Sequence, residues 1–266
     1  MKPAPFHYAA PASVQEALAL LDAEDARPLA GGQSLVPLLN FRLARPVLLV
    51  DLNRVEALEW SEATAGALRI GAMTRQTALL RSRAVAQRWP LLSQALAHVG
   101  HAATRSRGTI GGSVAHADPR AELPTALAAL DARFHLRAPV GERTVTVAEM
   151  FAGPYTTALR DGELLVEVEV PAPPPAARMA FVEHARTRGD FALAGAAVVV
   201  APAAHAAIAL LGADTVPVRA AEAERALLGG ADAAEVAHLA STGVADDHRR
   251  ALLTALIERA LASVAA

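Results

Sequence analysis

Hydrophobic and polar positions change their spacing along the chain, and these changes predict its helices and strands. Near the N-terminus, apolar residues at helical spacing predict a helix from Ser13 to Ala23, with Ser13 as N-cap and Glu16 completing a capping box. A short strand is expected near Arg27 to Ala30. The run from Pro46 to Leu52 is rich in branched apolar residues, which is typical of a buried strand.

The middle of the chain mixes patterns of period two and period 3.6. The expected strands are Ala67 to Met73, Ala132 to Pro139, Arg143 to Val147 and Leu164 to Pro171, and the expected helices are Thr74 to Ser82 and Val85 to Val99. Pro90 is expected to interrupt the second helix. The last strand alternates apolar and acidic residues, which predicts that one of its faces meets water.

The segment PAPPPAA, Pro171 to Ala177, predicts the clearest boundary in the chain, because consecutive prolines fit neither a helix nor a central strand. Beyond it the pattern predicts three strands followed by three helices, which is typical of a small α+β domain. The strands are expected at Arg178 to Arg186, Ala192 to Ala201 and His205 to Leu211, and the helices at Arg219 to Leu228, Ala233 to Ser241 and Asp247 to Ala262.

Composition and charge exclude several classes of protein. The 266 residues are 53% hydrophobic and 20% charged, as in soluble globular proteins, and no run is long and apolar enough for a membrane span. A net charge of −2 without a basic tract argues against nucleic-acid binding. The absence of cysteine excludes disulfides and iron–sulfur clusters held by this chain, and it is compatible with a cytoplasmic protein.

Two glycine-rich segments are the first candidates for chemistry: AGGQSL (Ala30 to Leu35) and GTIGGS (Gly108 to Ser113). Glycine can adopt positive φ, turn backbone amides inward and admit a ligand where a Cβ would block it. The hydroxyl groups of Ser34, Thr109 and Ser113 offer further donors to phosphate. Neither segment matches the Rossmann or the P-loop pattern. We therefore hypothesise that the two loops together bind the pyrophosphate of a dinucleotide.

The residues after the second segment permit other interpretations. His116, Asp118 and Glu122 are suitable metal ligands, but their spacing matches no usual zinc site; alternatively, Asp118 stabilises the turn at Pro119 while His116 packs nearby. A Ser113 nucleophile with His116 as base lacks the usual elbow motif. The polar segment RTRGDFA (186–192) is expected to be a turn between strands.

Taken together, the segments resemble one family. AGGQSLVPLLNFRLARPVLLVDL is similar to the first flavin-binding signature of the FAD-binding medium subunits of molybdenum hydroxylases, and RSRGTIGGSVAHADPRAELP is similar to the second. That family includes the flavoproteins of carbon monoxide, nicotinate and xanthine dehydrogenases. LRIGAMTR, GELLVEVEVP and RGDFALAGAAV follow the family's order, and the resemblance extends from Phe6 to about Gly212.

The resemblance implies an α+β fold. A two-part FAD-binding domain of the vanillyl-alcohol-oxidase (PCMH) type is expected over residues 1–174, with subdomains of about 1–56 and 57–174. A small C-terminal α+β domain, a three-stranded antiparallel sheet with helices, is expected over 178–266. The implied FAD-binding residues are Ala30, Gly31, Gly32, Gln33, Ser34, Leu35, Thr109, Ile110, Gly111, Gly112, Ser113, His116, Asp118, Glu122 and Leu165. Among them, Glu122 is expected near a ribose hydroxyl and Leu165 near the isoalloxazine.

The resemblance implies an electron-transfer role with no catalytic residue and no metal ligand on this chain. The expected partners are a large subunit with a molybdopterin cofactor, a small subunit with [2Fe–2S] clusters and an external electron acceptor. A stand-alone flavin oxidase or dehydrogenase of the same fold is the alternative; a scaffold that has lost its flavin and a metal hydrolase at His116 are further ones. The chain departs from the family at DDHRRALLTALIERAL, which is short and lacks a tyrosine, and at AATR (102–105).

Overall fold

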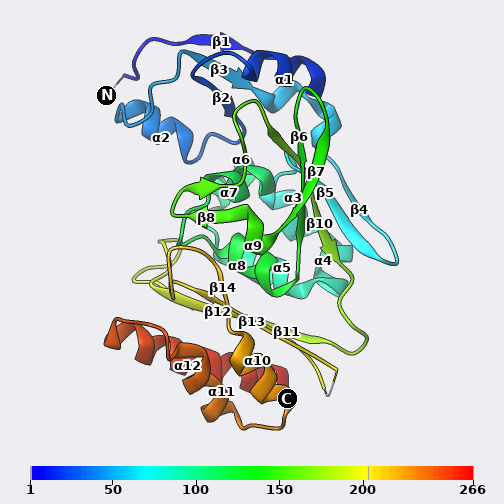
Figure 1. The fold of residues 1–266 in the computed structure, drawn as a ribbon, viewed down its shortest axis with the longest axis vertical. Helices are drawn as coiled ribbons and strands as arrows, with labels where there is room; N and C mark the ends of the chain where they lie inside the picture. Colours follow the sequence, from blue (N-terminus) through cyan, green and yellow to red (C-terminus); the bar gives the residue numbers. More distant parts are fainter. Residues whose placement is uncertain (1, 203, 266) are drawn as a thin grey trace.

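The computed structural model describes residues 2–202 and 204–265. Figure 1 shows three parts stacked along the long axis: an N-terminal lobe, a middle part, and a C-terminal sheet with its helices. The α+β fold class expected from the sequence is confirmed. None of the described helices is both long enough and apolar enough to cross a membrane.

The N-terminal lobe is a parallel sheet of order β1-β3-β2 with one helix in each crossover. Its elements are β1 (His7–Ala9), α1 (Val14–Leu21), β2 (Ala26–Leu29), α2 (Leu35–Asn40) and β3 (Leu48–Asp51). Ser13 caps α1 as predicted, because its hydroxyl accepts a hydrogen bond from Glu16 N at 3.1 Å. The Glu16 carboxylate accepts from Ala12 N, one residue before the position that a capping box requires.

The middle part is built on an antiparallel sheet of order β4-β5-β10-β6-β7. Its strands are β4 (Ser61–Ala63), β5 (Ala67–Gly71), β6 (Arg133–Arg137), β7 (Glu142–Thr146) and β10 (Leu164–Pro171). The helices are η1 (Leu52–Arg54), η2 (Glu56–Leu58), α3 (Gln76–Arg81), α4 (Arg83–Arg88), α5 (Pro90–His98), α6 (Ala102–Arg107), α7 (Ile110–His116), α8 (Glu122–Ala129) and α9 (Val147–Met150), with a small hairpin of β8 (Phe151–Gly153) and β9 (Thr156–Thr157). Pro90 does break the predicted helix, since α5 begins at this residue.

The prediction of a water-exposed face on β10 is wrong for Glu167. β10 is the central strand; its Val168 and Val170 point into the core, and Glu167 is only 7% exposed. Side chains of the neighbouring strands cover this carboxylate, above all Arg69 on β5. Alternation along one strand predicts which residues share a face, but the side chains of neighbouring strands decide how exposed that face is.

The GTIGGS segment contains a helix start in place of the predicted loop. Thr109 is the N-cap of α7, and its hydroxyl accepts a hydrogen bond from Gly112 N at 3.0 Å. Ile110 N and Gly111 N donate to the carbonyl groups of Thr74 and Ala72, at 3.1 and 2.9 Å. These tertiary hydrogen bonds stabilise a first helical turn that two glycines would disfavour in isolation.

The C-terminal sheet has the order β11-β12-β13-β14 and is antiparallel. Its elements are β11 (Arg178–His184), β12 (Ala194–Ala201), β13 (His205–Leu211), β14 (Val218–Arg219), α10 (Ala221–Leu228), α11 (Ala233–Ser241) and α12 (Asp247–Ala265). The three predicted strands are present. A fourth, the two-residue edge strand β14, was not predicted because it is too short to give a periodic signal.

Both faces of the C-terminal sheet are buried. Val198 and Ile208 pack with the residues of α11 and α12, whereas Ala197 and Val199 belong to the same core as α5 and α8 of the middle part. The apolar composition of β12 and β13 follows from this double coverage. The division into residues 1–174 and 178–266 stays a prediction, because this shared core continues across the proline segment.

Candidate cofactor-binding site

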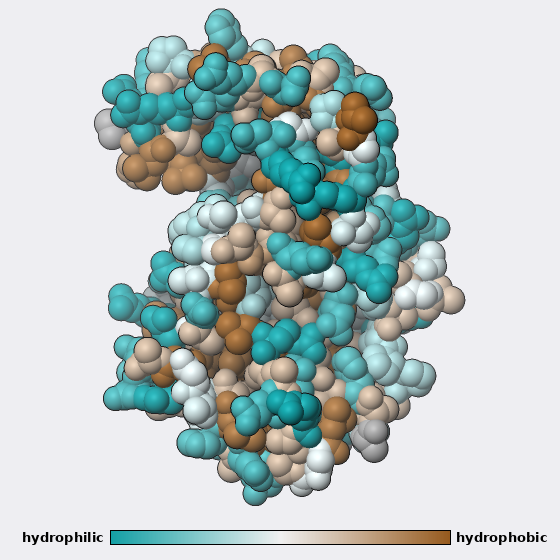
Figure 2. Space-filling view, in the orientation of Figure 1, coloured by the Kyte–Doolittle hydropathy of each residue, from teal (hydrophilic) through white to brown (hydrophobic). Residues whose placement is uncertain are grey.

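The two glycine-rich segments, about eighty residues apart in sequence, are in direct contact. A Cβ built on Gly31 would lie 2.8 Å from the carbonyl carbon of Arg107 and 2.9 Å from Gly108 Cα. A Cβ on Gly112 would lie 3.5 Å from the Cβ of Ala30. Figure 2 shows an indentation at this level, below α2, between the N-terminal lobe and the middle part.

The first segment presents backbone amides that donate to no other described residue. Gly32 has φ +74°, a conformation that favours glycine, and its carbonyl accepts from Val36 N at 3.1 Å. In residues 2–202 and 204–265, the amides of Gly32, Gln33 and Ser34 donate to no protein acceptor. Successive free amides beside a positive-φ residue form a concave anion-binding site, which fits a pyrophosphate.

The second segment uses its backbone amides within the protein. The amides of Ile110, Gly111, Gly112 and Ser113 already donate to protein oxygens. A Cβ on Gly111 would lie 2.6 Å from both the Cβ and the carbonyl oxygen of Ala72, so the packing of α7 on Ala72 by itself requires glycine here, and its contact with a cofactor stays a prediction. The group of this segment best able to meet a phosphate is the hydroxyl of Ser113, which is half-buried, whereas Thr109 is 2% exposed.

A side-chain brace that the sequence analysis missed holds the two segments together. Arg75 donates to the carbonyl of Arg107 at 2.5 Å and to Asn53 Oδ1 at 2.7 Å. Asn53 Nδ2 in turn donates to the carbonyl of Ala30 at 3.1 Å. A lone arginine and a lone asparagine form no motif, so only the fold identifies the brace.

His116 and Asp118 shape the turn between α7 and α8. The Asp118 carboxylate accepts from Arg120 N at 2.9 Å, as in the non-metal alternative. The His116 ring packs on Tyr155, with centroids 5.2 Å apart, and burial lowers the pKa of His116. Ala117, at φ +49°, ends α7 and directs the chain toward α8.

Glu122 is a buried carboxyl group at the first residue of α8. It is 7% exposed, and desolvation raises its pKa to about 7. No hydrogen bond from another described residue reaches its carboxylate. Close by, Glu183 Oε1 lies 3.1 Å from His98 Nδ1, while Glu183 Oε2 is buried without a hydrogen-bond partner among the described residues. The donor that reaches the Glu122 carboxylate is its own backbone amide, so the group keeps acceptor capacity that fits a ligand hydroxyl group, such as a ribose hydroxyl.

Leu165 lies on β10 at a bulge between Leu165 and Glu167, and it is 5% exposed within the main core. The carbonyl of the next residue, Val166, accepts from Ala72 N at 3.0 Å, which places Leu165 beside the strand end on which α7 packs. Only a small part of its side chain is free to contact a ligand. Its contact with the isoalloxazine stays a prediction.

The segment RTRGDFA forms the predicted turn between β11 and β12 and lies beside the α7–α8 turn. Phe191 is 52% exposed, and the guanidinium of Arg120 lies 5.2 Å from its ring centroid. Gly189 packs against the ring of His101, since a Cβ there would lie 2.8 Å from His101 Nδ1. The C-terminal sheet thus extends a loop to the edge of the candidate site.

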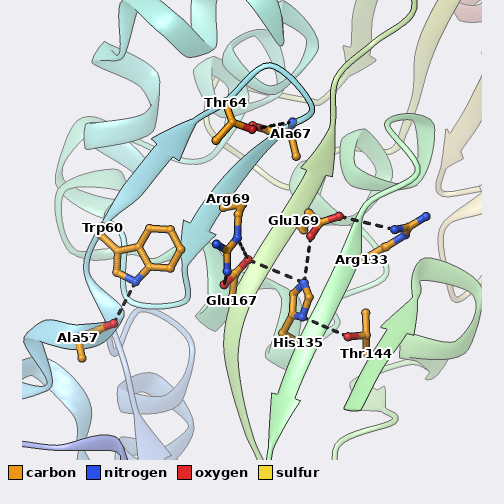
Figure 3. A network of polar contacts seen from close by, with 10 residues as sticks. All are labelled: Ala57, Trp60, Thr64, Ala67, Arg69, Arg133, His135, Thr144, Glu167 and Glu169. Atoms are coloured by element: carbon orange, nitrogen blue, oxygen red, sulfur yellow. Dashed lines mark hydrogen bonds and ion pairs between the residues drawn. The ribbon is translucent and has the colours of Figure 1, made fainter. Parts of the chain in front are cut away.

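Among the described residues, one group of side chains lies close enough together to hold a metal ion, and it consists of His135, Glu167 and Glu169, on the outer face of the middle sheet. It does not include His116, Asp118 or Glu122. His135 Nε2 lies 3.8 Å from Glu167 Oε1 and 3.4 Å from Glu169 Oε2, and Figure 3 shows the three side chains pointing toward one another. Arg69 binds both oxygens of Glu167, at 2.6 and 2.7 Å, and Arg133 lies 3.7 Å from Glu169. Because two arginines already balance the two carboxylates, this cluster is explained as an ion-pair network.

Comparison with protein families and with curated proteins gives a consistent result. A family model described as the FAD binding domain in molybdopterin dehydrogenase matches residues 4–173. The chain is 47% identical over 202 residues to 6-hydroxypseudooxynicotine dehydrogenase complex subunit alpha of Paenarthrobacter nicotinovorans, across 75% of this chain and 68% of that protein. It is 42% identical to the carbon monoxide dehydrogenase medium chain of Hydrogenophaga pseudoflava, across 75% and 70%.

Solved structures extend the similarity to the C-terminal part. A chain of carbon monoxide dehydrogenase from Hydrogenophaga pseudoflava superimposes with a TM-score of 0.93 at 38% identity, covering 99% of this chain and 98% of that one. A chain of quinoline 2-oxidoreductase from Pseudomonas putida 86 gives a TM-score of 0.93 at 40% identity, covering 100% and 99%. The similarity therefore includes the residues beyond 173.

Proposed function

The chain belongs to the family of FAD-binding domains in molybdopterin dehydrogenases, and from this premise we propose how it takes part in electron transfer. It is an FAD-binding medium subunit of a molybdenum hydroxylase complex, and hence part of an oxidoreductase. We propose which residues hold the cofactor, where its electrons come from and which partners the chain binds. The observation that carries it is the contact between the two glycine-rich segments beside three free backbone amides.

The proposed cofactor contacts follow from the groups that the protein leaves free. The amides of Gly32, Gln33 and Ser34 are positioned to donate to the pyrophosphate, with the Ser113 hydroxyl as a further donor. The Glu122 carboxyl group accepts from a ribose hydroxyl. Bound FAD supplies a redox group that accepts one or two electrons; this chain binds it, orients it and limits its exposure to water.

The proposed electron donor is a separate subunit with [2Fe–2S] clusters, because this chain has no cysteine to ligate iron. A large subunit with a molybdopterin cofactor oxidises the substrate, and an external acceptor takes the electrons at the end. Relatives at 47, 40 and 42% identity are named for 6-hydroxypseudooxynicotine, caffeine and carbon monoxide. Because similar medium subunits serve such different substrates, we place substrate selection in the large subunit. A cytoplasmic complex is part of the same proposal.

A stand-alone flavin oxidase would need a substrate cavity in its C-terminal domain. In this chain helices cover both faces of the C-terminal sheet, as the shared cores with α5, α8, α11 and α12 indicate. This packing fills both faces of the sheet with the side chains of neighbouring helices, and it favours the subunit function.

The test is reconstitution followed by reduction. The purified chain is titrated with FAD, and we expect one non-covalently bound FAD per chain, which is released from the protein on denaturation. In the complete complex, substrate added without oxygen is expected to bleach the flavin only when the iron–sulfur subunit is present. A chain that takes up no FAD would refute cofactor binding. If substrate bleaches the flavin of the isolated chain as fully as that of the complete complex, the stand-alone oxidase is favoured.

A further inference from the structure

Exposed apolar side chains are concentrated on α2 and the segment after it. Of the nine large hydrophobic residues that are exposed in the described chain, four lie within twelve residues of sequence. They are Val36 (41% exposed), Phe41 (65%), Leu43 (75%) and Val47 (55%), and we call them the α2 patch. Figure 2 shows this apolar area in brown at the lower left of the N-terminal lobe. Single exposed apolar residues are ordinary, whereas a cluster marks an interaction surface.

The α2 patch is held in a defined conformation. Phe41 N donates to the carbonyl of Pro37 at 2.9 Å, and Leu43 N donates to that of Leu38 at 2.9 Å. The carbonyl of Val47 accepts from His7 N at 2.8 Å, which joins the end of the segment to β1. Because the backbone is already ordered, a partner can bind here without the entropy cost of ordering a loop.

The charged side chains of the patch segment itself are positive, and an acidic residue, Asp25, meets only its end, where the Asp25 carbonyl accepts from Val47 N at 3.1 Å. Between residues 30 and 47 the only charged side chains are Arg42 and Arg45, and both are exposed. Arg42 Nε also donates to the carbonyl of Lys2 at 3.3 Å, which brings a third basic residue to this edge. An apolar centre with a basic rim complements a surface that is apolar at its centre and acidic at its rim.

We infer that the α2 patch is the docking surface for the [2Fe–2S] subunit. This inference rests on the proposed function, and two observations favour this occupant. First, α2 begins at Leu35, immediately after the free amides of Gly32 to Ser34, so a chain docked on α2 lies next to the proposed cofactor. Second, this chain has no cysteine, so its electron donor must approach the cofactor from another polypeptide.

The first test is a pair of charge substitutions in the complete complex, purified through a tag on this subunit. The variant F41E/L43E is expected to keep its FAD and its melting temperature, and to recover at least tenfold less iron–sulfur subunit. Val140→Glu is the matched control, because Val140 is 93% exposed on the distant β6–β7 turn, and it is expected to recover the subunit normally. Undiminished recovery with F41E/L43E would overturn the inference.

The second test identifies the occupant. A photo-crosslinking amino acid replaces Leu43 in the complex, with the same replacement at Val140 as control, and the attached chain is identified by mass spectrometry. We expect attachment to the iron–sulfur subunit from position 43 alone. Attachment to the molybdenum subunit or to a second copy of this chain, or none at all, contradicts the inference. A wild-type chain that binds no FAD, or copurifies with no iron–sulfur subunit, contradicts the proposed function itself.

Discussion

The carbonyl group of Arg107 lies directly against Gly31, in the position that a side chain at residue 31 would occupy. This contact joins the N-terminal lobe to the middle part at the point where both glycine-rich segments face the candidate site. The glycine is required there by the close approach of two backbones, since Gly31, unlike Gly32, does not have positive φ.

Gly31→Ala is expected to separate the two segments and to lower the FAD content of the purified protein. The added Cβ overlaps backbone atoms that cannot rotate away, and such overpacking costs about 1–3 kcal/mol. Absorbance gives FAD per chain, and thermal unfolding gives the stability. Gly66→Ala is the control, because a Cβ at that turn meets no atom within 4 Å, and its FAD content is expected to be normal. Full FAD content in Gly31→Ala would show that the contact is dispensable.

Arg75→Lys is expected to weaken FAD binding while the core stays folded. A lysine ammonium lacks the planar fork with which Arg75 reaches both the Arg107 carbonyl and Asn53. Flavin fluorescence titration measures the affinity, and we expect a loss of about tenfold, or about 1.4 kcal/mol. Arg81→Lys, at an exposed residue at the end of α3, serves as control. If the two variants bind FAD equally well, the brace has no role in the site.

Glu122→Gln is expected to stabilise the FAD-free protein at pH 8. Burial raises the pKa of Glu122 from 4.5 to about 7, so the folded state holds this proton more tightly than the unfolded state does. The free energy of unfolding of the wild-type protein therefore falls as the pH rises from about 4.5 to 7. Above pH 7 the total loss is at most about 3 kcal/mol. Glutamine is neutral throughout, so the variant should not lose this contribution.

Urea unfolding of the FAD-free protein at pH 5 and pH 8 measures the difference, with Glu222→Gln at an exposed position of α10 as control. The same Glu122 variant is expected to bind FAD several-fold more weakly at pH 8, since a neutral acceptor loses about 1 kcal/mol relative to a charged one. Stability and affinity should thus change in opposite directions. Equal unfolding curves for variant and wild type at both pH values would disprove the effect of burial.

Glu167→Gln is expected to destabilise the middle sheet by about 1–2 kcal/mol, because the buried carboxylate makes a bidentate ion pair with Arg69. The comparison is Glu142→Gln, which removes a solvent-exposed pair with Arg137 and should change the free energy of unfolding by about 0.5 kcal/mol or less. Chemical denaturation of both variants checks this. A smaller loss for Glu167→Gln than for Glu142→Gln would contradict the importance of burial.

Most helices and strands were predictable because their signals are local. Periodicity located β5, β6, β7, β10 and the C-terminal strands, and Pro90 marked the start of α5, since proline fits the first turn of a helix and not its interior. The short strand β14 has too few residues for a periodic signal. Glu167 was expected to face water, and Arg69, ninety-eight residues away in sequence, covers it.

For the candidate site, too, the sequence predicts some features and the fold decides the others. The two glycine-rich segments stand out in the sequence because a backbone that must pass close to a ligand or to another backbone restricts the residue to glycine. The family and its cofactor followed from the resemblance of these segments to known flavin-binding signatures. Which glycine does what was decided by the fold: Gly32 adopts positive φ, Gly31 admits the Arg107 carbonyl, and Gly111 packs on Ala72. Only the tertiary structure brought Arg75 and Asn53 to these segments, because contacts between residues far apart in sequence depend on how the whole chain packs.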